Sequence, residues 1–135
     1  MLNVPDHKKN VNTKGGVQTL TEAEQRGATL MFHLLKEFLR ERQTMPISNA
    51  YAFLLVAQEE GLSVQEYAKR ADMGQTSMTR LLFDIGSHTR TRDPGLGLVM
   101  QRSDPNDLRR HQTFLTDKGR ALIRRINSLL KLKSG

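Results

Sequence analysis

The segment that decides the fold is Leu62–Gly86, which reads LSVQEYAKRADMGQTSMTRLLFDIG. Its first half opens with Ser63 and Glu66, a spacing at which each side chain can bind the other's backbone amide and so begin a helix. Its second half, from about Gln75 to Gly86, carries apolar residues at i, i+3, i+4 and i+7. These residues are Met78, Leu81, Leu82 and Ile85. Two short helices joined by a tight turn predict a helix-turn-helix over residues 62–86.

The chain after this segment predicts a β-hairpin at residues 97–115. Leu98–Gln101 reads as one strand and His111–Leu115 as the returning strand. Between them, Asp104–Asp107 reads DPND, and proline presets one turn dihedral while Asp and Asn tolerate the others. A hairpin that follows a helix-turn-helix is a wing. Residues 87–96 have no hydrophobic period and are predicted to be an inserted loop.

The flanking segments predict further helices. Thr21 and Glu24 form a second capping-box pattern, and Pro46 ends the helix predicted over 20–44. Ser48 or Asn49 is expected to cap a short helix that stops near Gly61, and Thr116 to cap a last helix over 116–133. Residues 1–19 are polar and predict a flexible tail. The sequence thus predicts one mainly α winged-helix domain over 20–135, with a small β-hairpin.

Composition excludes several classes of protein. The chain has 135 residues, no cysteine and no tryptophan, so disulfides and thiolate zinc sites are excluded. Only 5% of residues are aromatic, which disfavours single-strand binding by base stacking. The sequence contains no apolar run of membrane-spanning length and no signal-peptide pattern, so a cytoplasmic location is expected and no membrane partner. The net charge is +7, and residues 74–135 account for the whole surplus. A basic half indicates a polyanionic partner or a solvated basic face.

The second helix of the helix-turn-helix carries the first set of candidate DNA-binding residues. With its apolar stripe facing the core, the outward residues are small hydroxyls, one glutamine and one arginine. In a major groove, the N-terminal part of such a helix contacts base edges, and these side chains bind adenine, guanine or phosphate. The alternative is an ordinary solvated helix face. The predicted contact residues are Gln75, Thr76, Ser77, Thr79 and Arg80.

The wing supplies the second set. Arg109 and Arg110 follow its turn, and guanidinium groups are attracted to a narrow minor groove. Asp107 is expected to hold one arginine extended through a bidentate ion pair. The alternative is a surface turn with an incidental ion pair. Arg90 and Arg92 in the insertion are candidates for additional phosphate contacts.

Residues of about 48–125 resemble the MarR family of bacterial winged-helix regulators. The matching segments are LSVQEYA (62–68), TSMTRLL (76–82), DPNDLR (104–109) and LTDKGRAL (115–122). The last two are similar to the family's wing tip and to the start of its dimerisation helix. The insertion near 87–96 and Leu108, where the family often has a basic or small residue, depart from the pattern.

The resemblance implies a homodimer that forms through both terminal helices and binds a palindromic double-stranded DNA site. It also implies that the protein is a transcription regulator and acts as a repressor. Packing of one terminal helix on the other within one chain is the alternative to dimerisation. A small-molecule effector is also implied by the resemblance, with a pocket near His33, Tyr51 or Phe53, although these residues suit an ordinary core.

Functions other than transcription regulation differ in how well they fit the sequence. An enzyme, a cofactor and a metal site are not expected, because the four histidines are scattered and no nucleotide-binding glycine motif is present. A winged helix that only binds proteins is the first alternative, because it needs neither the hydroxyls nor the wing arginines. The second is a phage or plasmid accessory factor that binds DNA without controlling a promoter.

Overall fold

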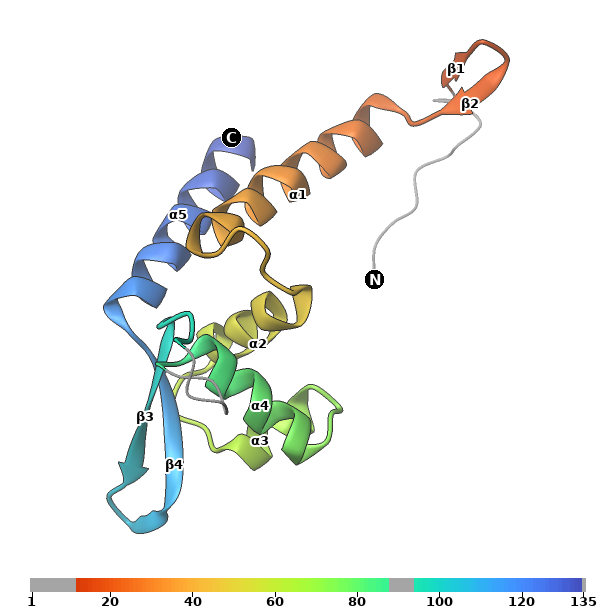
Figure 1. Cartoon of the computed structure of the whole chain (residues 1–135). Helices are drawn as coiled ribbons and strands as arrows, with labels where there is room; N and C mark the ends of the chain where they lie inside the picture. Colours follow the sequence, from red (N-terminus) through yellow and green to blue (C-terminus); the bar gives the residue numbers. More distant parts are fainter. Residues whose placement is uncertain (1–11, 88–93, 135) are drawn as a thin grey trace.

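The computed structural model describes residues 12–87 and 94–134. Its helices and strands follow the order expected of a winged helix, with the additional helices α1 before it and α5 after it (Figure 1). They are β1 (Asn12–Lys14), β2 (Val17–Thr19), α1 (Glu22–Glu41), α2 (Ile47–Gln58), α3 (Val64–Arg70), α4 (Gln75–Ile85), β3 (Val99–Asp104), β4 (Asp107–Leu115) and α5 (Asp117–Ser134). The predicted fold class, mainly α with a small β-hairpin, is confirmed.

The core lies where α2, α3, α4 and the base of the wing meet. Both predicted capping boxes form, and Ser63 thereby fixes the start of α3. The Tyr67 hydroxyl donates to the carbonyl oxygen of Glu59 at 2.7 Å, and burial raises the pKa of this phenol. The most deeply buried large side chains are Phe53, Val56, Tyr67, Met78, Ile85, Leu96, Leu98, Val99 and Leu122. The stripe predicted for α4 therefore faces inward and leaves its opposite side to solvent.

The wing is a twisted antiparallel pair, longer than the sequence predicted. Val99 is opposite Leu115 and Ser103 is opposite His111, with an irregularity in register before the turn. In the turn, the Asn106 amide donates to Asp104 Oδ1 at 2.8 Å. The base of β4 is also bonded to the segment before α3, because the Gly61 amide donates to the Thr113 carbonyl at 2.8 Å. The wing is thus fixed to the helix-turn-helix at its base and projects freely at its tip.

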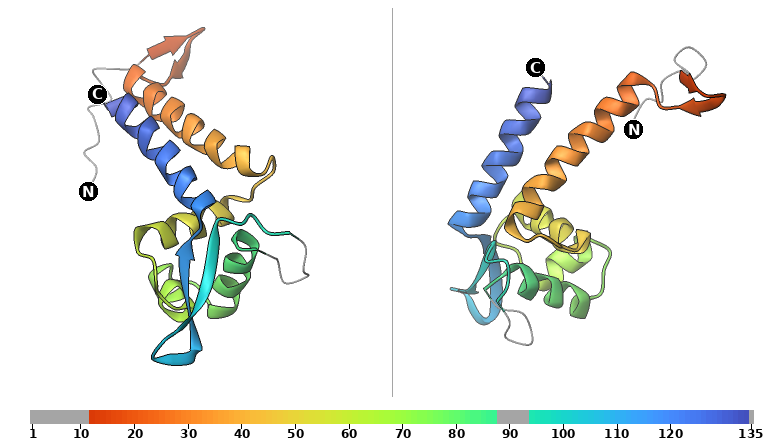
Figure 2. Two further views of the ribbon diagram at one scale, coloured as in Figure 1. Left: turned by 90° about the vertical axis from the view of Figure 1, so that its left-hand side faces the viewer. Right: turned by 45° about the horizontal axis from the view of Figure 1, so that its top comes forward.

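Helices α1 and α5 extend from the core on the side opposite the wing tip (Figure 1; Figure 2). Ion pairs join them: Arg125 Nε contacts Glu37 Oε1 at 2.8 Å, Arg125 Nη2 contacts Glu41 Oε1 at 2.6 Å, and Lys118 Nζ contacts Glu41 Oε2 at 3.6 Å. Burial of Glu37 raises its pKa, but the hydrogen bond from Arg125 and the charges of Arg40 and Arg125 outweigh burial and leave the pKa lowered. The two terminal helices therefore pack on each other within one chain.

Replacing Arg125 by methionine is expected to destabilise this junction by about 1–2 kcal/mol, because two partly buried carboxylates lose their shared partner. Since the pKa of Glu37 is lowered on folding, its contribution is present near neutral pH and is lost as Glu37 becomes protonated, below about pH 4. The stability difference from wild type, measured by urea unfolding, should accordingly shrink as the pH falls. The exposed neighbour Arg124, replaced by methionine, is the control. A difference that is independent of pH would contradict the ion-pair explanation.

Two predictions of secondary structure are wrong. Residues 12–19 form a hairpin instead of a flexible tail, because Gly15 and Gly16 have φ of 59° and 80°, which suits a two-residue hairpin turn. Residues 1–11 of the predicted tail lie outside the described residues. Helix α2 begins directly after Pro46, whose carbonyl accepts from the Asn49 amide at 3.0 Å, and no side chain caps it. Ser48 and Asn49 are helical, and Asn49 is buried.

Candidate nucleic-acid interface

The first wall of the candidate interface is the outer side of α4. Met78, Leu82 and Ile85 fix the helix to the core. The helix begins after Gly74, which offers no side-chain cap, so the first amides are open to an external acceptor such as phosphate. The predicted contact residues are exposed at this end, except Thr79, which is partly buried. The exposed set is Gln75, Thr76, Ser77 and Arg80.

The wing arginines differ from each other in their surroundings. Arg110 Nη2 contacts Glu66 Oε1 at 2.8 Å, and the pKa of Glu66 is lowered by hydrogen bonding to Ser63 first and then by the charge of Arg110. Within the described residues, the Arg109 guanidinium has no ion-pair partner. The predicted pairing of an arginine by Asp107 is wrong in detail, because Asp107 Oδ1 accepts from the Arg109 backbone amide at 3.1 Å. This carboxylate therefore shapes the turn.

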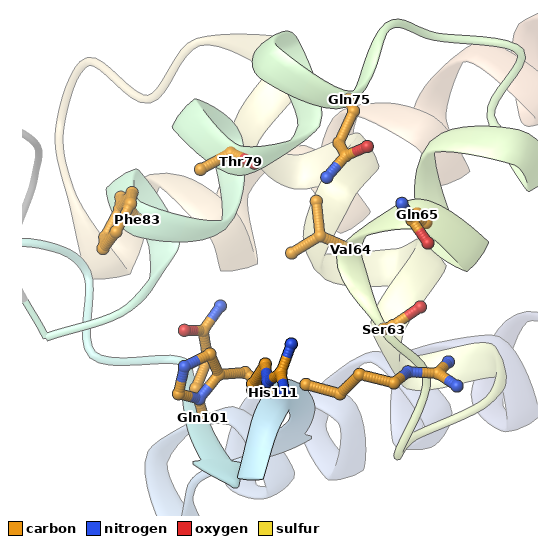
Figure 3. A pocket seen from close by; sticks show the side chains of 10 residues that line it. Ser63, Val64, Gln65, Gln75, Thr79, Phe83, Gln101 and His111 are labelled. Atoms are coloured by element: carbon orange, nitrogen blue, oxygen red, sulfur yellow. The ribbon is translucent and has the colours of Figure 1, made fainter. Parts of the chain in front are cut away.

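A cleft of about 340 Å³ separates α4 from the wing (Figure 3). It brings together Gln75 and Thr79 of α4 with Arg109 and Arg110 of β4, although the two pairs come from segments far apart in sequence. Thr76, Ser77, Arg80 and Asp107 are predicted site residues that do not line it. Arg90 and Arg92 lie outside the described residues, so their placement stays a prediction. The full lining is Ser63, Val64, Gln65, Gln75, Thr79, Phe83, Gln101, Arg109, Arg110 and His111.

Sequence reasoning missed three conspicuous residues of this cleft: Phe83, Gln101 and His111. Phe83 is 42% exposed and lines the cleft. The signal for Phe83 was available, because it follows Gln75 and Thr79 at helical spacing. Gln101 and His111 could not be chosen from sequence, since the face of the hairpin that turns toward α4 depends on how the wing docks.

The chain that leads from the insertion into the wing is bonded to the end of α4 and to the residue after α1. The Leu96 amide donates to the Asp84 carbonyl at 3.0 Å, and the Leu98 amide donates to the Ile85 carbonyl at 2.8 Å. Arg42 Nη2 also donates to the Pro94 carbonyl at 3.1 Å. Leu96 itself is buried. The end of α4 and the start of the wing therefore stay in fixed relation despite the extra residues between them.

The residues named for an effector pocket are in different environments. Phe53 is fully buried and packs edge-on against Phe38, with ring centroids 5.9 Å apart. Tyr51 is 50% exposed, and His33 packs against the exposed Phe32. Over residues 12–87 and 94–134, no group of three metal-binding side chains comes together, and no helix is long and apolar enough to cross a membrane.

No family model and no curated protein matches this sequence. Solved structures do match it. A MarR-family transcription regulator is 21% identical, with a TM-score of 0.56 over 83% of this chain and 70% of its own. A MarR transcriptional regulator from Methanosarcina mazei Go1 is 14% identical, with a TM-score of 0.58 over 82% and 73% of the two chains. A mutant of MepR from S. aureus, bound to an oligodeoxyribonucleotide, is 18% identical, with a TM-score of 0.60 over 86% and 80%. At these identities the likeness shows that the chain has the winged-helix fold of these regulators.

Proposed function

We propose that this chain is a MarR-family transcription regulator, not an enzyme, that binds double-stranded DNA in the cytoplasm. The observation that carries the proposal is the cleft, where Gln75 and Thr79 of the helix-turn-helix lie opposite Arg109 and Arg110 of the wing. The helix-turn-helix and the wing, which in a winged helix contact different grooves of DNA, thus contribute polar and basic side chains to the same cleft. The DPNDLR and LTDKGRAL motifs support the family, and so does the winged-helix fold shared with the MepR mutant bound to an oligodeoxyribonucleotide.

The proposed contacts follow from the placement of the side chains. The exposed N-terminal part of α4 enters a major groove, where Gln75 and Arg80 read bases and the hydroxyls of Thr76, Ser77 and Thr79 bind bases or phosphates. Arg109 enters the neighbouring minor groove. Arg110 and Asp107 position the wing tip, since Arg110 is held by Glu66 and Asp107 binds the Arg109 amide. Arg90 and Arg92, outside the described residues, are assigned to flanking phosphates.

The proposed active form is a homodimer. Helix α1 exposes a set of large apolar side chains even though it packs on α5, and such a surface is typical of an interface between proteins. The exposed set is Met31, Phe32, Leu35 and Leu39 on α1, with Leu130 and Leu132 on α5. A two-fold dimer places two α4 helices in successive major grooves of a palindromic site. Bound there, it represses transcription by occluding polymerase.

The test of function is selection of genomic DNA fragments by the purified chain. A palindromic consensus, with the protein bound near promoters, supports a regulator. Sequence-independent recovery would instead support an accessory DNA-binding factor. No recovery, at low salt where phosphate contacts are strongest, would contradict DNA binding and favour a protein-interaction module.

Dimerisation is tested by replacing Phe32 with aspartate. Phe32 is 60% exposed on α1, and burying a new charge in each of two symmetry-related positions is expected to weaken self-association about 100-fold. Sedimentation velocity at micromolar protomer should show a wild-type dimer and a monomeric variant. The control is Leu108→Asp, because Leu108 is 75% exposed at the wing tip, away from the terminal helices. A monomeric wild type, or an unchanged Phe32→Asp dimer, would contradict this interface.

A further inference from the structure

The cleft between α4 and the wing lies where one sugar-phosphate strand of a bound duplex would pass. The major and the minor groove are separated by one sugar-phosphate strand. If α4 lies in a major groove and the wing tip in the adjacent minor groove, as proposed above, that strand passes between the two elements. In this molecule the space between them is the cleft of about 340 Å³.

The wing side of the cleft offers uncommitted hydrogen-bond donors. Gln101 and His111 lie side by side and face Thr79 and Phe83 of α4 across the cleft (Figure 3). Their orientation is set by the hairpin, because Thr113 continues the same face toward the base and is fully buried there. Within the described part of the chain, neither the Gln101 amide nor the His111 ring forms a hydrogen bond to protein. Side chains of this kind, left free in a basic cleft, are suited to phosphate oxygens.

We propose that one phosphodiester strand of the bound duplex runs through this cleft, with Gln101 and His111 donating to its phosphates and Phe83 packing against its sugars. The inference rests on the proposed function and adds three contact residues to it. Phe83 is 42% exposed between the polar walls, and its ring supplies the apolar surface that a deoxyribose can cover. Gln101 and His111 were not identifiable from the sequence motifs.

The charges around His111 favour an anion. Arg109 and Arg110 lie on the same strand and line the same cleft, and α4 and β3 contribute only uncharged side chains to its lining. Glu66 of α3, which follows Gln65 of the lining, is already bound to Arg110 and to Ser63.

The experiment measures binding of a labelled random-sequence duplex of about 25 base pairs at low salt, where phosphate contacts dominate affinity. His111→Ala and Gln101→Ala are each expected to weaken binding about fivefold at neutral pH, as for the loss of one hydrogen bond to a charged group. His111→Lys, which keeps a positive charge, should restore it. The controls are His33→Ala on α1 and Gln112→Ala, which lies on the other face of β4.

The outcomes separate this inference from the function on which it rests. If the wild-type chain binds neither this duplex nor selected genomic DNA, the proposed function fails and the inference fails with it. If wild type binds but His111→Ala and Gln101→Ala bind equally well, the protein binds DNA and the strand does not run through the cleft. Weakening by both cleft variants, with rescue by His111→Lys, supports the inference.

Discussion

Replacement of Arg109 by alanine is expected to weaken duplex binding about 30-fold, or about 2 kcal/mol, as for an arginine that enters a DNA groove. Arg109 is exposed near the wing tip, and its guanidinium has no ion-pair partner within the described residues, so it is available to DNA. The turn fixes its backbone, because Asp107 Oδ1 accepts from its amide at 3.1 Å. Fluorescence anisotropy over a range of salt concentrations should also show that the variant loses about one released counterion.

Two other wing arginines serve as matched controls. Arg102→Ala removes the same charge from the same hairpin, but the Arg102 guanidinium lies over the Phe114 ring, 5.9 Å from its centroid, and Arg102 does not line the cleft. Arg110→Ala should have a smaller effect than Arg109→Ala, since Glu66 already pairs with Arg110. Arg109→Lys should recover only part of the loss, because an ammonium group lacks the planar fork of donors. Equal affinities for Arg109→Ala and wild type at every salt concentration would contradict the role of the wing.

The largest effect on stability is expected from Gly119→Ala. Gly119 lies in the first turn of α5, where a Cβ would fall well inside the contact distance of the Leu98 carbonyl oxygen and 3.3 Å from the Phe53 ring. The Leu98 carbonyl cannot move freely, because it accepts the Thr116 amide at 3.0 Å. Either α5 or the start of the wing must shift. We expect a loss of about 3 kcal/mol, at the upper end for overpacking, and a melting temperature lower by roughly 10 °C.

Thermal unfolding should be compared at equal protomer concentration, because dimer formation adds to apparent stability. Gly27→Ala is the control, since no atom lies within 4 Å of a Cβ added at this exposed position in α1. Alanine there should stabilise the chain by about 0.5–1 kcal/mol through helix propensity. A Gly119→Ala variant that melts with wild type would show that α5 does not pack as closely on the base of the wing as the structure requires.

Local chemistry made the elements predictable. The capping boxes at Thr21 and Ser63, the apolar stripe of α4 and the DPND turn each act over a few residues, and each forms where it was expected. The errors were also local in origin. Gly15 and Gly16 lie in the segment that was predicted to be a flexible tail, whereas their positive φ values build a hairpin turn. Pro46 was interpreted only as the end of α1, although its carbonyl also begins α2.

The candidate site was predictable only in part. The residues of α4 and of the wing were predicted as two separate sets, because helical spacing and turn chemistry place each set on its own element. The docking of the wing against the helices places four of these residues in the lining of one cleft: Gln75, Thr79, Arg109 and Arg110. The same docking brings in Gln101 and His111, which no local pattern distinguished from ordinary surface residues, and it places Phe83 of α4 opposite them.

The sequence by itself thus determined the order and type of the elements from α1 onward, because capping, periodicity and turn formation depend on neighbours along the chain. Only the tertiary structure decided which wing arginine is free for a ligand. Arg110 is paired by Glu66, 44 residues earlier in the chain, while Arg109 is not. It also decided that Gly119 must lack a side chain, since Gly119 meets Leu98 across the base of the wing. These features depend on contacts between segments far apart in the chain, and their geometry is set by how the whole core packs.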